Sequence, residues 1–175
     1  YGQLDENGKE IDDGGNAWFI GQPIRVNYDF VWEGTWQLDE AEEATKWGTK
    51  PGFVKLKDFK DDGSLNADDK RIIGQQDPKF LWGMSNSFSF KGFNLDVFIH
   101  GVHGVTKENT LMTDETWADV RRNTITKNWW TPENPTNEWV VNELYAERMS
   151  GILGAIYEDA SFIRVKEVSL SNTLP

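Results

Sequence analysis

Cysteine is absent from this chain of 175 residues, and histidine occurs only twice. Without thiols the chain forms neither disulfides nor thiolate metal sites. Long apolar runs are also absent, since no stretch approaches the ~18 residues that a membrane-spanning helix needs. The absence of long apolar runs does not exclude a transmembrane β-strand, because the signal of such a strand is only ~10 residues of alternating polarity.

Basic residues are scarce relative to acidic ones. The 18 Lys and Arg stand against 29 Asp and Glu, which gives a formal net charge of -11. This balance argues against a nucleic-acid partner. The sequence also lacks a glycine-rich phosphate loop and a recognisable serine or cysteine nucleophile, so nothing specifies an enzyme. With 38% hydrophobic residues, the chain is nevertheless apolar enough to fold around a core.

A β-hairpin is the clearest local prediction. Polar and apolar residues alternate over residues 84–90 and again over 93–99, which is the pattern of half-buried strands. Lys91-Gly92 separates the two stretches, and glycine supplies the positive φ that two-residue hairpin turns favour. Pairing Phe90 with Phe93 keeps the apolar residues on one face, so turn chemistry and register agree.

Two further strands are predicted on either side of this hairpin. Residues 24–32 alternate with one apolar parity, and residues 161–170 form the last strand. In the last strand the apolar parity changes between Val165 and Val168. A bulge near Lys166-Glu167 would return both valines to the same face.

Two long segments, 34–81 and 106–160, connect these strands and exceed ordinary loops by a wide margin. Acidic residues at the start and a glycine near the end predict a short helix over residues 39–46. Helices are also predicted over 114–130 and 137–149, with prolines between them. We therefore expect two long, partly helical connections between antiparallel strands.

An acidic stretch, residues 58–69, has the spacing of an EF-hand-type calcium loop. Lys60, however, stands at the third position, where a ligand oxygen is expected. A turn held by Asx hydrogen bonds is the alternative interpretation. If calcium binds, the candidate ligands are Asp58, Asp62, Ser64, Asn66 and Asp69.

Nine tryptophans are the other distinctive feature of the composition. Indole rings stack on ligands such as sugars, form interfacial belts on membrane barrels and fill hydrophobic cores. Trp32 and Trp82 lie at strand ends, where a belt or packing role is expected. Four tryptophans of the long segments are candidates for ligand binding: Trp47, Trp117, Trp129 and Trp139.

Nine short motifs, taken in order, resemble a known family. They are Trp18–Ile24, Trp32–Gln37, Lys50–Phe53, Lys57-Asp58, Arg71–Gly74, Asp77–Phe80, Asn86–Leu95, Trp130–Pro135 and Asp159–Lys166. In this order they look like the C-terminal barrel portion of the SusC/RagA family of TonB-dependent outer-membrane transporters of Bacteroidetes. The resemblance implies that residues 1–175 are one fragment of a larger β-barrel domain.

The resemblance also implies a function and partners. Such proteins import oligosaccharides or peptides across the Gram-negative outer membrane, with a SusD-like surface lipoprotein and with TonB, which an N-terminal part contacts. The expected fold is mainly β: antiparallel strands of an incomplete outer-membrane barrel that contact lipid, with segments 34–81 and 106–160 outside the cell. The alternative from another class is a secreted carbohydrate-binding β-sandwich that uses exposed tryptophans.

Overall fold

The computed structural model describes residues 3–110 and 126–173, which are mainly β-strand. The helices are η1 (Leu38–Glu40), α1 (Ala41–Lys46) and η2 (Ala67–Asp69). The strands of the first half are β1 (Gln3–Leu4), β2 (Glu10–Ile11), β3 (Val26–Asp29), β4 (Trp32–Thr35), β5 (Val54–Leu56), β6 (Arg71–Gln75) and β7 (Phe80–Phe90). Those of the second half are β8 (Phe93–His103), β9 (Thr106–Glu108), β10 (Arg148–Met149), β11 (Ile152–Leu153), β12 (Tyr157–Asp159) and β13 (Phe162–Asn172).

The described chain divides into two compact units. The strand unit contains residues 3–27, 74–107 and 159–173, and the core unit contains residues 28–73, 108–110 and 126–158. No helix of the described ranges is long and apolar enough to cross a membrane.

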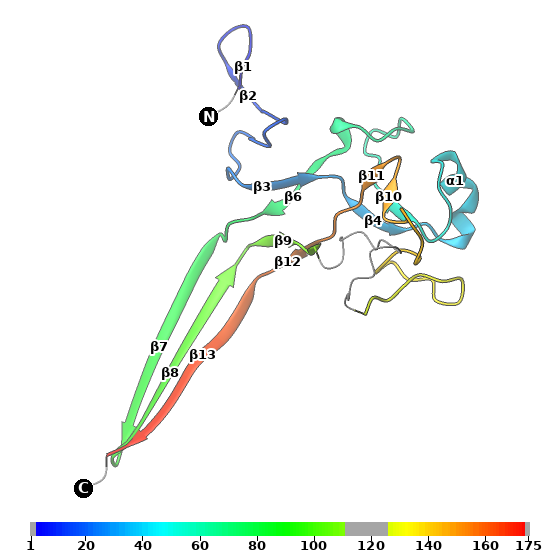
Figure 1. Cartoon of the computed structure of the whole chain (residues 1–175). Helices are drawn as coiled ribbons and strands as arrows, with labels where there is room; N and C mark the ends of the chain where they lie inside the picture. Colours follow the sequence, from blue (N-terminus) through cyan, green and yellow to red (C-terminus); the bar gives the residue numbers. More distant parts are fainter. Residues whose placement is uncertain (1–2, 111–125, 174–175) are drawn as a thin grey trace. The chain divides into compact units, whose positions relative to one another are not determined.

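The strand unit is built on an antiparallel sheet with the order β13-β8-β7. Figure 1 shows these three long strands side by side, with the tight β7–β8 turn at one end. Phe90 pairs with Phe93 across Lys91 and Gly92, and both turn residues have positive φ, 47° and 85°. The predicted hairpin and its register are therefore confirmed.

A bulge in β13 gives the sheet one apolar face. Val165 pairs with Ile99 and Val168 pairs with Val97, and the register shifts between Val165 and Glu167. Directly paired residues share a face, so the predicted bulge is confirmed and both valines lie on the same side.

The apolar face of this sheet is exposed. Asn86, His103 and Asn172 are its polar exceptions, and its apolar side chains are Phe80, Trp82, Met84, Phe88, Phe90, Phe93, Leu95, Val97, Ile99, Ile163, Val165, Val168 and Leu170. Phe88 is 60% exposed and Leu170 is 69% exposed. A β-sandwich would bury such a face against a second sheet, so this exposure argues against the sandwich alternative.

The opposite face is mostly polar. Paired residues place Ser87, Asp96 and Ser169 in one row across the three strands. The Ser87 hydroxyl donates a hydrogen bond to the Asp96 carboxylate, and one row nearer the turn the Ser89 hydroxyl donates to Asn94 Oδ1 at 2.7 Å. The sheet is therefore amphipathic, and its polar side chains bond to one another across the strands.

The core unit joins the two long segments around one hydrophobic cluster. Its buried members are Phe30, Trp36, Ala44, Val54, Leu56, Trp139, Val140, Ala146 and Met149. Trp139 is fully buried, and its ring stacks on that of Trp32 with centroids 5.8 Å apart. Because Trp36 and Val54 come from the first segment and Trp139 from the second, neither segment would bury this cluster alone.

The structure corrects two predictions and leaves part of a third outside its range. The first strand, predicted over residues 24–32, is shorter in the structure. It corresponds to β3, which ends at Asp29, and Trp32 already begins the next strand, β4. The helix predicted over 137–149 is absent: the Val141 N–H donates to the Gly52 carbonyl at 2.7 Å, and the turn hydrogen bonds within the segment join residues two or three positions apart rather than four. Most of the predicted helix 114–130 lies outside the described residues, whereas the helix over 39–46 is confirmed by η1 and α1.

Candidate functional site

The first strand pair of the core unit, β4 with β5, supports a candidate site. Lys57 directly follows β5, and the alternation of residues 54–57 puts Val54 and Leu56 in the core while Lys55 and Lys57 point the other way. The second segment braces this pair, because Asn137 Oδ1 accepts a hydrogen bond from the Thr35 backbone N–H at 3.0 Å. A Cβ on Gly34 would lie 2.6 Å from that Oδ1, so the close approach requires glycine there.

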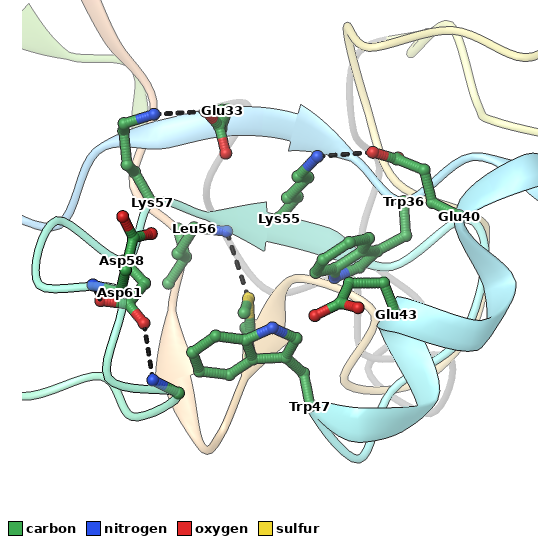
Figure 2. Close-up of a pocket in the computed structure, with 12 residues that line it drawn as sticks. Glu33, Trp36, Glu40, Glu43, Trp47, Lys55, Leu56, Lys57, Asp58 and Asp61 are labelled. Atoms are coloured by element: carbon green, nitrogen blue, oxygen red, sulfur yellow. Dashed lines mark hydrogen bonds and ion pairs between the residues drawn. The ribbon is translucent and has the colours of Figure 1, made fainter.

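A pocket of about 360 Å³ lies beside the β4–β5 strand pair and is bounded by β4, β5, α1 and the start of the acidic loop (Figure 2). Two tryptophans, Trp36 and Trp47, line it together with Lys55 and Lys57. Five carboxylates also line it: Glu33, Glu40, Glu43, Asp58 and Asp61. The pocket is therefore acidic overall and contains aromatic surface.

Both lysines of the pocket are already paired. Lys55 Nζ lies 2.6 Å from Glu40 Oε1, and Lys57 Nζ lies 2.9 Å from Glu33 Oε1. Burial is the largest single effect on Glu40 and opposes its ionisation, but the hydrogen bond from Lys55, the backbone N–H of Gln37 and the charge of Lys55 together outweigh it, so the pKa of Glu40 is lowered. The hydrogen bond to Glu33 raises the pKa of Lys57. The lysines thus neutralise two of the five carboxylates and leave the rest to other groups.

Trp36 carries the unusual polar atom of this pocket. The side chain is 3% exposed, and its indole Nε1 is buried without a hydrogen-bond partner among the described residues. Lys55 Nζ lies over the ring at 4.8 Å from its centroid, so the face of the indole is occupied while its N–H group is not. An unpaired buried donor costs about 1–3 kcal/mol.

The predicted ligand-binding tryptophans have different surroundings. Trp47, at the end of α1, is partly buried against the core and lines the pocket. Trp129 is also partly buried, and its ring meets Trp139 edge-on at 6.5 Å. Trp139 is fully buried, so it presents no surface to a ligand in this conformation. Trp117 lies outside the described residues.

The acidic loop is closed by its own hydrogen bonds. Asp58 Oδ1 accepts from the backbone N–H groups of Lys60 and Asp61 at 3.0 and 2.8 Å. Asp62 Oδ1 accepts from the Ser64 backbone N–H at 2.9 Å, and Asn66 Oδ1 caps η2 through the N–H of Asp68. These are the Asx hydrogen bonds of the alternative interpretation.

Asp69 holds the two ends of this loop together. The side chain is fully buried, with Oδ1 accepting from the Phe59 N–H at 3.0 Å and Oδ2 from the Asn66 N–H at 2.9 Å. These backbone donors, Asn66 foremost, lower the pKa of Asp69. Across residues 3–110 and 126–173, no group of three or more His, Asp or Glu side chains has a metal-binding arrangement.

Sequence reasoning found Trp47, Asp58 and the acidic loop but missed the lysines and Trp36. The alternation of Val54, Lys55, Leu56 and Lys57 was the available signal, because it marks a strand with a basic face. The partners of these lysines lie 15 and 24 positions away in the sequence, so spacing alone does not bring them together.

The fold is that of an antiparallel β-protein with one exposed apolar sheet face and a separate globular unit. No family model matches the chain. The chain is similar to two TonB-dependent receptors of Formosa agariphila. It is 26% identical to receptor P26 over 174 residues, 94% of this chain and 17% of the receptor, and 25% identical to receptor P3 over 158 residues, 89% and 16%. The chain thus spans about a sixth of the length of these relatives, and the similarity supports the TonB-dependent receptor part of the sequence resemblance.

Proposed function

We propose that this chain is part of a TonB-dependent outer-membrane transporter and that β7, β8 and β13 are membrane-spanning strands of its barrel. The observation that carries the proposal is the exposed apolar face of the three-stranded sheet. Similarity to two TonB-dependent receptors supports the same assignment. In a barrel this face contacts lipid, the polar face lines the lumen, and the two sheet edges pair with further strands.

The dimensions of the sheet fit this role. Each of the three strands has 11 residues. At about 3.3 Å per residue such a strand is about 36 Å long, and a tilt of about 40° reduces its height to about 28 Å, enough to cross the apolar band of about 25 Å in outer-membrane barrels. On the apolar face, Phe80 and Trp82 lie toward one end, and Phe88, Phe90 and Phe93 lie toward the other. Such aromatic residues at both ends are typical of interfacial girdles.

The polarity follows from the connections. Phe80, His103 and Phe162 lie at the same end of the sheet, so the second long segment leaves and re-enters the strands there and the first long segment enters them there. Outer-membrane barrels have short periplasmic turns and long extracellular loops. We therefore assign the Lys91-Gly92 turn to the periplasm and the core unit to the outer surface of the cell.

The finer assignment is a SusC-like importer of oligosaccharides or peptides that works with a SusD-like surface lipoprotein. The motif order described above supports it, as does a loop unit with an open pocket, since loops on rigid strands are where binding residues concentrate. Contact with TonB belongs to parts of the protein outside this chain. Trp47, Trp129 and Trp117 remain the tryptophans proposed to meet the substrate or the lipoprotein.

Two neighbouring substitutions test the lipid-facing assignment. Val168→Arg puts a charge near the middle of the apolar face, where arginine costs about 2–4 kcal/mol in lipid. Ser169→Arg puts the same charge on the polar face of the same strand and is the matched control. In the full-length protein we expect Val168→Arg to reduce the folded, membrane-inserted fraction, measured by heat-modifiable gel mobility, while Ser169→Arg leaves it near that of the wild type. Equal behaviour of the two variants would overturn the proposal.

A further inference from the structure

The polar face of the three-stranded sheet changes character toward the end that lies away from the tight turn (Figure 1). Near the turn, the hydroxyl groups of Ser87 and Ser89 bond to side chains of the neighbouring strand. At the other end Leu81, Val102 and Phe162 are paired across the three strands and form an apolar row on the same face. Leu81 is 63% exposed and Phe162 is 38% exposed. An exposed apolar row on an otherwise polar face indicates a contact surface.

A pair of basic side chains lies next to this row. Arg164 and His100 are direct cross-strand partners, so their Cβ atoms are about 5 Å apart. Both contact Phe162: the guanidinium carbon of Arg164 lies 5.0 Å from the ring centroid, and the His100 ring meets the same ring edge-on with centroids 5.8 Å apart. These contacts place the two basic groups beside the apolar row. The mouth patch consists of Leu81, Val102, Phe162, His100 and Arg164.

Arg164 is the cation of the mouth patch that has no partner. Within residues 3–110 and 126–173 it makes no ion pair and donates no hydrogen bond, whereas Arg25 bonds to Asp77 and Gln76. Stacking on Phe162 orients the guanidinium and leaves its N–H donors available. A carboxylate matches this planar group with two parallel hydrogen bonds. The patch therefore combines an apolar surface with a site for a carboxylate.

The neighbouring charges favour an anion at this place. Lys166 and Glu167 occupy the next row toward the turn, and neither forms an ion pair with Arg164 among the described residues. Two cations and one carboxylate give this part of the face a formal net charge of +1. Asp96 lies one row further away and accepts the hydroxyl of Ser87. No other acidic side chain of the three strands faces Arg164.

We propose that the mouth patch binds the C-terminal end of a short peptide whose last residue is apolar. The peptide carboxylate pairs with Arg164 and accepts a further hydrogen bond from His100, and the last side chain packs on the apolar row. Binding breaks no covalent bond and transfers no group. The inference names peptides as the substrate class, and it rests on the proposed function, because only in a barrel does this face line the path of a substrate.

Other ligands meet only part of these conditions. A neutral sugar leaves Arg164 without a carboxylate, and an acidic sugar places its hydroxyl groups against the apolar row. A fatty acid supplies a carboxylate and an apolar chain but no further polar group. A peptide backbone has both N–H and C=O groups, and Glu167 and Lys166 beside the patch offer an acceptor and a donor for them. A peptide is therefore the ligand that uses the patch and its polar neighbours together.

Calorimetric titration of the full-length transporter in detergent micelles tests this preference. N-acetylalanylleucine offers a carboxylate with an apolar side chain, its C-terminal amide offers the side chain alone, and N-acetylalanylglycine offers the carboxylate alone. Hexanoate and galacturonate present the carboxylate on a fatty acid and on a sugar. We expect N-acetylalanylleucine to bind at least about tenfold more tightly than each of the others. Equal affinity for any of them, or no binding of N-acetylalanylleucine, would overturn the proposal.

Substitutions then assign the roles. Arg164→Gln removes the charge, so it should weaken N-acetylalanylleucine binding about tenfold and leave binding of the amide unchanged. Val102→Ser removes apolar surface and should weaken both. The matched control is Lys91→Asn, which removes a cation in the tight turn and keeps a residue that tolerates the positive φ of 47° there. Unchanged binding in Arg164→Gln, or the same loss in Lys91→Asn, would contradict the assignment.

Heat-modifiable gel mobility of the same variants separates a binding role from a structural one. If Arg164→Gln lowers the folded fraction while the protein that does fold binds N-acetylalanylleucine like the wild type, Arg164 pairs with another part of the protein and the proposal is wrong. Failure of the proposed function has a different sign. Equal behaviour of Val168→Arg and Ser169→Arg removes the barrel, whereas the expected difference between them together with no peptide preference removes only the peptide site.

Discussion

Val165 and Val168 lie on the same face of β13 although an odd number of positions separates them. In a regular strand they would point to opposite sides, but Lys166 is the extra residue between the pairs Val165–Ile99 and Glu167–Phe98. The bulge brings Ile163 and Val165 into line with Val168 and Leu170. One inserted residue therefore produces the continuous apolar face on which the membrane assignment depends.

Deletion of Lys166 should destroy this continuity. Without the extra residue, either Ile163 and Val165 or Val168 and Leu170 must turn to the polar face, because a shift of one position reverses every side chain. We expect the deletion to abolish folded, membrane-inserted protein, measured by heat-modifiable mobility. Lys166→Ala removes only the side chain and keeps the bulge, so it should behave like the wild type. A folded deletion variant would show that the bulge is dispensable.

Gly101 should not tolerate a side chain. A Cβ placed there would lie 2.2 Å from Trp82 Nε1, because the indole covers the glycine across the β7–β8 pair. We expect Gly101→Ala to lower the free energy of unfolding by about 1–3 kcal/mol, the usual cost of overpacking. The measurement is urea denaturation in micelles.

Two companion variants separate this clash from general intolerance of the sheet. Trp82→Leu in the Gly101→Ala background should restore part of the loss. Gly83→Ala should cost less, since a Cβ at Gly83 meets only the edge of the Phe98 ring at 3.1 Å. If Gly83→Ala is as harmful as Gly101→Ala, the clash with Trp82 is not the cause.

Features set by local alternation were predictable from the sequence. The hairpin at Lys91-Gly92 and the bulge at Lys166 follow from period-two patterns and from turn chemistry, both of which act between near neighbours. The helix predicted over 137–149 failed for the opposite reason. Its apolar residues Trp139 and Val140 belong to a core shared with the first long segment, and contacts with that segment override the helical spacing.

The pocket was only partly predictable. Trp47 and the acidic loop stand out in the sequence, but Lys55 meets Glu40 and Lys57 meets Glu33 only after β4 and β5 have paired. The unpaired N–H of Trp36 is a property of packing, which no spacing pattern reports. Long-range pairing and burial therefore determine the part of the site that sequence reasoning missed.

Trp139 and Trp47 should differ sharply in their effect on stability. Trp139 is fully buried and stacked on Trp32, so Trp139→Ala should lower the free energy of unfolding of the core unit by about 3–5 kcal/mol. Trp47 is partly exposed, so Trp47→Ala should cost less, on the order of 1 kcal/mol. Urea denaturation followed by near-UV circular dichroism measures both. Equal losses would assign Trp47 to the core rather than to the pocket.

Calcium, if it binds, should use the oxygens of Asp58, Asp62, Asn66 and Asp69 and the carbonyl of Ser64. These carboxylates already accept backbone N–H groups, and Lys60 Nζ lies 3.1 Å from Asp68 Oδ2 beside the loop. Binding must replace those hydrogen bonds, so we expect weak or no affinity in calorimetric titration. Submicromolar affinity would contradict this, and Lys60→Asn, which restores a ligand oxygen, should then strengthen binding further.

Acid should weaken the acidic loop through Asp69. Three backbone N–H groups lower the pKa of this carboxyl below its ordinary value of 3.8, so the folded loop favours the ionised form. The stabilisation is present above the ordinary pKa and is lost as the pH falls through the lowered pKa of the folded state. Asp69→Asn should therefore be less stable than the wild type at pH 7, and the difference should shrink below about pH 4. Urea denaturation at both pH values measures this difference, with Glu133→Gln as a control for a carboxylate outside the loop. A gap between the wild type and Asp69→Asn that stays constant or widens in acid would mean that the ionised carboxylate does not hold the loop closed.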